Sequence, residues 1–177
     1  RRFYFINPYA YFTSELASTA FPSSILLGRA IRAGKSVEDP YYYPYYSSIP
    51  FLSTYYPPHL LQAWLGSYLP LDWAYILYTL TLLLHFLWAC LGGWILFSIM
   101  GPWPALFGSL TIAYMGYCIK QNSSIIYTLA WIPWLLAGAE YHDPLLFGIS
   151  LGAIILAGYW PIGIPAGGLA CCYWLSR

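Results

Sequence analysis

The sequence predicts an all-α membrane protein with about four transmembrane or half-spanning helices, preceded by a large loop region with short interfacial helices. Composition is the first observation: hydrophobic residues make up 60% of the chain and charged residues only 7%, with a mean hydropathy of +0.59. A soluble domain carries about 25% charged residues. The second is an aromatic content of 21%, because Tyr and Trp favour the membrane–water interface. The third is a series of long apolar runs in the second part of the chain.

The charged residues divide the chain into two parts. Residues 1–72 hold nine of the thirteen charges and eight of the fourteen prolines, and residues 73–177 hold the other four charges. We therefore expect an extracytoplasmic or interfacial loop region over 1–72 and a helical transmembrane bundle over 73–177. The net charge of +1 gives no reason to expect a nucleic-acid partner.

Apolar runs in the second part predict the membrane helices. The run over 73–99 exceeds the roughly 20 residues that cross a bilayer. The runs over 104–119 and 125–139 are shorter, so they form either an antiparallel pair in a thinned bilayer or a hairpin shielded by other helices. The run over 145–175 contains glycine and proline, and we expect it to break near 159–165.

Two short helices are predicted in the first part. One begins at Ser23 or Ser24 as the N-cap and runs to Ala33, where Gly34 ends it. The other covers 58–69 and is amphipathic. Its large apolar residues share one face, and three small or polar residues lie off that face: Leu60, Leu61, Trp64, Leu65, Tyr68 and Leu69, against Gln62, Gly66 and Ser67. We expect this helix to lie in the interface, and residues 36–72 to rest on the membrane surface, because so short a segment cannot build its own core.

Adjacent acids and a tyrosine run form the main candidate for chemistry. Glu38 and Asp39 precede Tyr41, Tyr42 and Tyr43. Paired carboxylates can bind a divalent cation or share general-base work, and tyrosine rings offer flat faces and hydroxyls to sugars. The same residues also suit an ordinary turn before proline and an aromatic belt, so spacing alone leaves both interpretations open.

Other ionisable residues are candidates with simpler alternatives. Arg29, Arg32 and Lys35 suit lipid phosphates or headgroup-level solvation. His85 lies mid-span, where it either binds a ligand or is a neutral histidine bonded to a neighbouring helix. Asp72 is expected to cap the first span.

Near residue 140 the sequence resembles a metal-binding cluster. Glu140 and His142, two residues apart, point to different sides of a helix. Asp143 before a proline suits a helix start. We therefore expect a turn. The four cysteines have no zinc-ligand spacing and are expected to be buried thiols.

A set of short motifs, in order, resembles the YfhO-like bacterial membrane proteins. The matching segments are Gly34–Tyr43, Ile49–Leu52, Tyr56–Pro58, Leu82–His85, Gly116–Tyr117, Leu129–Trp134 and Leu156–Pro161. This family is related to the GT-C glycosyltransferases, multi-span enzymes that take sugars from polyprenyl-phosphate donors. Their catalytic acid typically lies in the first extracytoplasmic loop. The resemblance implies a multi-pass protein of the bacterial inner membrane.

For function, the resemblance implies transfer or binding of a sugar from a polyprenyl-phosphate donor at the extracytoplasmic face. Asp39, helped by Glu38, would act as general base or would hold a divalent cation. The substrate-binding residues would be Tyr41, Tyr42, Tyr43, Arg29, Arg32, Lys35 and His85, with the cations meeting the donor phosphate.

Two functions of other classes stay open. A non-catalytic subunit of a larger membrane complex is indicated by Asn7, which stands where the family usually has an acid, and by glycines such as Gly92 and Gly93 that allow close helix approach. The family's first membrane helix also has no counterpart here, so we expect a fragment, a truncated relative or the ordered part of a longer protein. A transporter or channel component would rest only on His85 and the break near 159–165. The expected partners are membrane lipids, a polyprenyl-phosphate sugar and other membrane subunits.

Overall fold

The structure, a computed structural model, describes residues 21–35, 55–118 and 123–176, and these residues are helical apart from short turns. The elements are α1 (Phe21–Arg32), α2 (Pro57–Gly66), α3 (Leu71–Phe97), the 3-10 turn η4 (Ser98–Met100), α4 (Pro102–Cys118), α5 (Ser123–Glu140), α6 (Pro144–Ala157) and α7 (Trp160–Ser176). No strand occurs within these ranges, so the all-α prediction is confirmed for the described chain.

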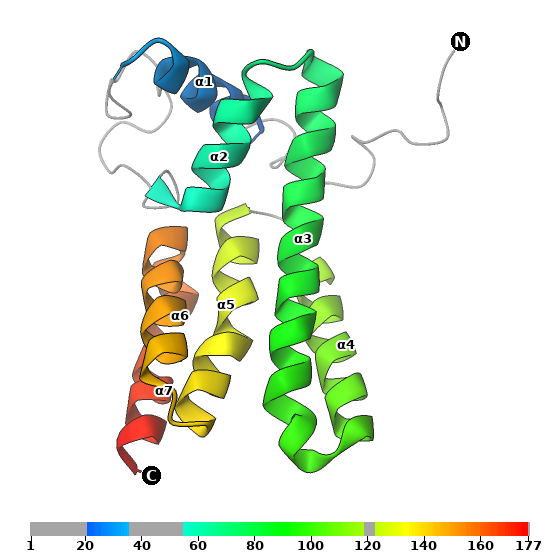
Figure 1. The fold of residues 1–177 in the computed structure, drawn as a ribbon, viewed down its shortest axis with the longest axis vertical. Coiled ribbons are helices and arrows are strands. Elements are labelled where there is room, and N and C mark those ends of the chain that lie inside the picture. Colours follow the sequence, from blue (N-terminus) through cyan, green and yellow to red (C-terminus); the bar gives the residue numbers. More distant parts are fainter. Residues whose placement is uncertain (1–20, 36–54, 119–122, 177) are drawn as a thin grey trace.

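Helix α3 is the longest described helix, and it contacts α1, α2, α4 and α5. One half of it contacts α1 and α2, the other half contacts α4 and α5, and α6 and α7 pack on α5 (Figure 1). We call the end where α3 begins the α1–α2 end, and the end with the η4 and α5–α6 turns the turn end. With η4, α3 covers 30 residues, about 45 Å. It is the one described helix long and apolar enough to cross a membrane.

The helices lie close to the predicted ranges, with local corrections. The last run breaks at Gly158, whose φ of 81° ends α6, whereas Pro165 lies inside α7. Asp143 caps α6 as predicted, since its Oδ1 accepts from the amides of Leu145 and Leu146 at 3.0 Å each. The prediction for Asp72 was wrong: Pro70 is the N-cap of α3, and Asp72 lies in the first helical turn without a capping bond.

Helix α1 also starts earlier than predicted. It begins at Phe21, so neither Ser23 nor Ser24 is its cap. The hydroxyl of Ser24 instead donates to Gln62 of α2 at 3.1 Å, in a fully buried position. The predicted stop is confirmed, because Gly34 has a φ of 65° and its amide bonds to the carbonyl of Ile31.

The amphipathic helix α2 keeps its large apolar residues together on one face, as the sequence indicates, and this face points away from the protein. Its large apolar residues Leu61, Trp64 and Leu65 are exposed, whereas Gln62 and Gly66 are buried. The helix therefore packs its small and polar side on the protein and leaves its large apolar side outward. Helix α2 does not lie across the end of the bundle. It runs beside the first half of α3 (Figure 1).

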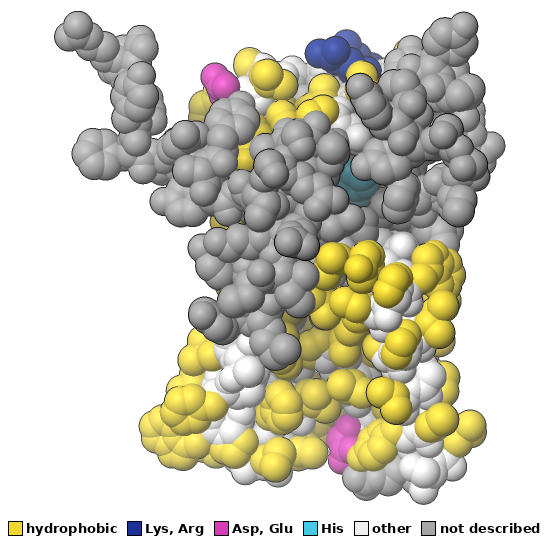
Figure 2. All heavy atoms as spheres, turned by 180° about the vertical axis from the view of Figure 1, so that it is seen from behind, with side chains coloured by type: hydrophobic (Ala, Val, Ile, Leu, Met, Phe, Trp, Pro, Cys, Tyr) yellow, Lys and Arg dark blue, Asp and Glu magenta, His cyan; other side chains and the backbone are white. Residues whose placement is uncertain are grey.

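The rest of the described surface is also apolar, and small residues form much of the interior. Many buried residues are alanine or glycine, and the exposed side chains include Leu145 and Leu169 at 71% and Leu175 at 84%. Figure 2 shows cations and an acidic side chain at the α1–α2 end, another acidic side chain at the turn end, and hydrophobic side chains over much of the described surface between them. A surface of this composition matches a hydrocarbon solvent better than water.

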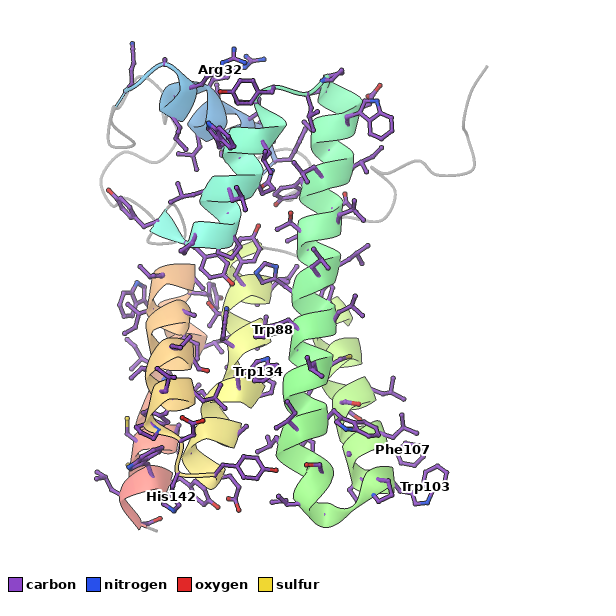
Figure 3. All side chains as sticks on the ribbon, viewed as in Figure 1. Arg32, Trp88, Trp103, Phe107, Trp134 and His142 are labelled. Atoms are coloured by element: carbon purple, nitrogen blue, oxygen red, sulfur yellow. The ribbon has the colours of Figure 1, made fainter. Side chains whose placement is uncertain are left out.

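Small residues allow the helices to approach closely. A Cβ added to Gly28 of α1 would lie 1.9 Å from the backbone oxygen of Ala63 in α2. A Cβ added to Gly92 of α3 would lie 2.7 Å from Nε1 of Trp134 in α5, whose indole N–H donates to the carbonyl of Trp88 (Figure 3). The first contact brings two helix backbones together, as in membrane helix interfaces, and the second makes room for an indole ring between α3 and α5.

Gly28→Ala tests the α1–α2 contact. The added methyl group meets backbone atoms that cannot rotate away, so we expect a loss of about 1–3 kcal/mol in unfolding free energy, measured by thermal or denaturant unfolding in detergent. Gly152→Ala in α6 is the matched control, because nothing lies within 4 Å of its added Cβ. It should be neutral or stabilising by up to about 1 kcal/mol. Equal effects of the two changes would contradict the packing described here.

Candidate functional site

The first polar grouping lies at the α1–α2 end. Arg29, Arg32 and Lys35 are all exposed; the two arginines lie in the last turn of α1, and the lysine follows it. Cations are favourable there because the final carbonyl groups of a helix carry partial negative charge. Local helix electrostatics therefore explains part of this cluster without a ligand.

Arg32 has a defined position within this cluster. Its Nη1 donates to the carbonyl of Ser67 at 2.8 Å, and its guanidinium carbon lies 5.2 Å from the centre of the Tyr68 ring (Figure 3). The side chain thus joins the end of α1 to the end of α2. A guanidinium has five N–H donors, so the single bond to Ser67 leaves donors that can reach a phosphate or carboxylate.

Large apolar side chains surround the cations. Tyr68, Leu69, Leu71 and Trp73 are exposed on the connection from α2 into α3. Basic residues beside aromatic and aliphatic side chains are typical of protein surfaces at lipid-headgroup level, where the charge meets phosphate and the apolar groups meet acyl chains.

The second polar grouping is buried where α2, α3 and α5 meet. The Tyr56 hydroxyl lies 2.8 Å from Nε2 of His85 and accepts the indole N–H of Trp131 at 2.7 Å. Nδ1 of His85 lies 2.6 Å from the carbonyl oxygen of Thr81, which can only accept. Nδ1 therefore carries a proton, and in the neutral imidazole, the form that burial favours, Nε2 accepts the proton of the Tyr56 hydroxyl.

Aromatic rings enclose this junction. Tyr127 of α5 is fully buried, and its ring centre lies 4.6 Å from that of His85, 5.1 Å from that of Tyr56 and 5.9 Å from that of His59. Both nitrogens of His85 are engaged, and its side chain is only 7% exposed. The arrangement favours the interpretation of His85 as a neutral histidine bonded to a neighbouring element over that of a ligand contact.

The structure separates the predicted site residues that it describes. Arg32 contacts Ser67 at the end of α2, whereas His85 contacts Tyr56 at its beginning. The eleven residue steps from Tyr56 to Ser67 correspond to about 16 Å of helix. One phosphate cannot touch both side chains.

The predicted acids and tyrosines lie outside the described residues. These are Glu38, Asp39, Tyr41, Tyr42 and Tyr43, together with the divalent cation considered for the acids. In the described ranges, no three His, Cys, Asp or Glu side chains gather to hold a metal. Glu140 instead accepts a hydrogen bond from Tyr173, and the His142 ring packs on Trp174, as expected for a turn.

Sequence reasoning missed two members of the buried junction. Tyr56 and Trp131 are 75 residues apart, and no local pattern links them. Both lie in motifs that carry the family resemblance, Tyr56–Pro58 and Leu129–Trp134. The presence of these two motifs together with Leu82–His85 in one chain is the sequence feature that could have pointed to the junction.

Comparisons with protein-family models, with curated proteins and with solved structures give no match to this chain.

Tyr56→Phe tests the buried junction. Removing the hydroxyl leaves the indole N–H of Trp131 and Nε2 of His85 without their shared partner, so we expect a loss of about 1–3 kcal/mol in unfolding free energy. Tyr68→Phe is the control, because it removes a hydroxyl from an exposed ring and keeps the face that Arg32 covers. Denaturant unfolding in detergent measures both variants. A Tyr56→Phe protein as stable as the control would show that the network contributes nothing.

Proposed function

We propose that this chain belongs to a YfhO-like, multi-pass membrane protein that binds a phosphate-bearing lipid at its α1–α2 end, the substrate being a polyprenyl-phosphate sugar. The observation that carries the proposal is the position of Arg29, Arg32 and Lys35, which lie at one end of a surface that is otherwise strongly apolar.

Membrane embedding is supported by both sequence and packing. No charged residue occurs in 73–119, 121–139 or 144–176. The described helices in these ranges expose leucine and tryptophan and bury alanine and glycine. In water such a surface would drive aggregation, whereas in hydrocarbon it costs nothing. Helices α4 to α7 are then the shorter members of the bundle around α3.

Phosphate binding is supported by the geometry of the cationic cluster. The Ser67 carbonyl and the Tyr68 ring hold Arg32 in place, which reduces the entropy lost on binding. A planar guanidinium also matches the oxygens of a phosphate. Each basic residue near an anionic membrane surface contributes about 1 kcal/mol. The sugar and its transfer come from the family resemblance, with Asp39 as the general base.

A non-catalytic subunit is the second candidate, and the surface of α6 and α7 favours it. An apolar groove of about 210 Å³ lies between these helices, lined by residues that include Ile154, Trp160 and Gly167. Added Cβ atoms at Gly148 and Gly152 would meet nothing within 4 Å. A smooth apolar face of this kind accepts another membrane helix.

Replacing Arg29 and Lys35 together by glutamine tests phosphate binding and leaves the structural contacts of Arg32 in place. With about 1 kcal/mol for each charge, we expect roughly 30-fold weaker binding of a short-chain prenyl phosphate, measured by titration of the purified full-length protein in detergent. Arg177→Gln, which removes one charge after α7, is the control. Affinity for the corresponding prenyl alcohol should not change. Equal affinity of the double variant and the parent for the phosphate would refute this site.

Asp39→Asn tests the catalytic part of the proposal. An amide cannot accept the proton of an attacking hydroxyl, so we expect sugar transfer by the full-length protein from a polyprenyl-phosphate donor to fall at least 100-fold, while prenyl-phosphate binding is retained. Unchanged transfer would exclude Asp39 as the base. If the parent protein shows no transfer and copurifies with a stoichiometric membrane partner, the subunit function replaces the catalytic one.

A further inference from the structure

We infer that α2 is a half-membrane helix that stands upright in one leaflet, with its N-terminus held at membrane depth by the Tyr56–His85–Trp131 network. The inference rests on the membrane embedding proposed above and adds the depth and direction of α2. It names the hydrocarbon of a single leaflet as the partner of the outer face of this helix.

Two contacts fix the height of α2 against α3. At its beginning, the Tyr56 hydroxyl bonds to His85, midway along the 30 residues of α3 and η4. At its end, a Cβ on Gly66 would lie 3.7 Å from Cβ of Ala74. The two helices therefore run antiparallel over about 16 Å. A helix lying flat on the membrane surface would cross α3 at one level, which these two contacts exclude.

The length and charge of α2 fit one leaflet. Its ten residues rise about 15 Å, half of a hydrocarbon core of roughly 30 Å. Its outer face presents Leu61 and Leu65, which are 57% and 39% exposed. The cations of α1 lie beside its last residues, at the level of anionic headgroups. An apolar face below a cationic end is complementary to a lipid leaflet, with acyl chains below phosphate.

The N-terminus of α2 is suited to an apolar environment. A helix start leaves about four backbone N–H groups without partners, and each is costly in hydrocarbon. Pro57 and Pro58 occupy the first two positions and have no N–H. The Tyr56 side chain, which precedes them, is buried and hydrogen-bonded to His85 and Trp131. Few unsatisfied donors remain at the point where the helix would reach greatest depth.

Spin-label depth measurements distinguish an upright helix from a flat one. In a full-length background with Cys90, Cys118, Cys171 and Cys172 replaced by serine, single cysteines at Leu61 and Leu65 would carry a nitroxide in phosphatidylglycerol-containing liposomes. The ratio of oxygen to nickel-chelate collision rates reports depth. Counting from the two fixed contacts places Leu61 level with Leu80 and Leu65 level with Ile76, so labels at Leu80 and Ile76 of α3 are the matched references.

We expect Leu61 to lie about 6 Å deeper than Leu65, and each label to match its α3 reference. Equal depths at Leu61 and Leu65 would show a flat helix and overturn the inference. Access of the nickel chelate to both α2 labels, with the α3 labels protected, would also overturn the inference. Low collision rates of the α2 labels with both reagents would overturn it as well, because they would mean that protein and not lipid covers this face. Access of the nickel chelate to the α3 references as well would refute membrane embedding itself.

Discussion

Small residues at the helix contacts determine how closely α1 approaches α2 and how closely α3 approaches α5. Gly28 against Ala63 and Gly92 against Trp134 bring helices so close that a single methyl group would not fit. With alanine and glycine at these contacts, most of the large exposed side chains of the described residues are leucine, isoleucine and tryptophan. With only thirteen charges in the chain, no alternative arrangement could cover that surface with polar groups. The scarcity of charge and the small residues at the helix contacts both agree with the membrane embedding proposed above.

Small-residue contacts bring helices together but define their relative height poorly, because smooth faces can slide. The buried polar network of Tyr56, His85 and Trp131 defines this relative height. One Tyr56 hydroxyl donates to His85 and accepts from Trp131, so the base of α2 is tied to α3 and α5 at a single level. Breaking either bond would leave a buried polar group unsatisfied, which costs more than the bond itself contributes. The second tie, from Ser24 to Gln62, fixes α1 on α2 in the same way.

The sequence predicted the existence and approximate bounds of the helices, because apolar runs bounded by proline, glycine and polar turns are local signals. It could not predict which face of α2 points inward. Periodicity shows that Leu61 and Leu65 share a face, but the same pattern serves a helix packed on a core and one bathed in lipid. The prediction of Ser24 as an N-cap failed for a related reason. A serine near a helix start has the sequence pattern of a cap even where its hydroxyl bonds to a residue of another helix, here Gln62. The junction of Tyr56 with Trp131 depends on a contact across 75 residues, beyond any local pattern.

The two polar groupings act at different places because α2 separates them. Arg32 at the end of this helix can reach a group at headgroup level, while His85 at its base is enclosed by Tyr56, Tyr127 and Thr81. A role for His85 in direct substrate contact would require both of its nitrogen partners to leave. Its present arrangement instead lets it set the height of α2, and through Ser67 the position of the Arg32 guanidinium. His85 therefore supports the position of α2 in the structure and lies about 16 Å of helix away from the Arg32 contact.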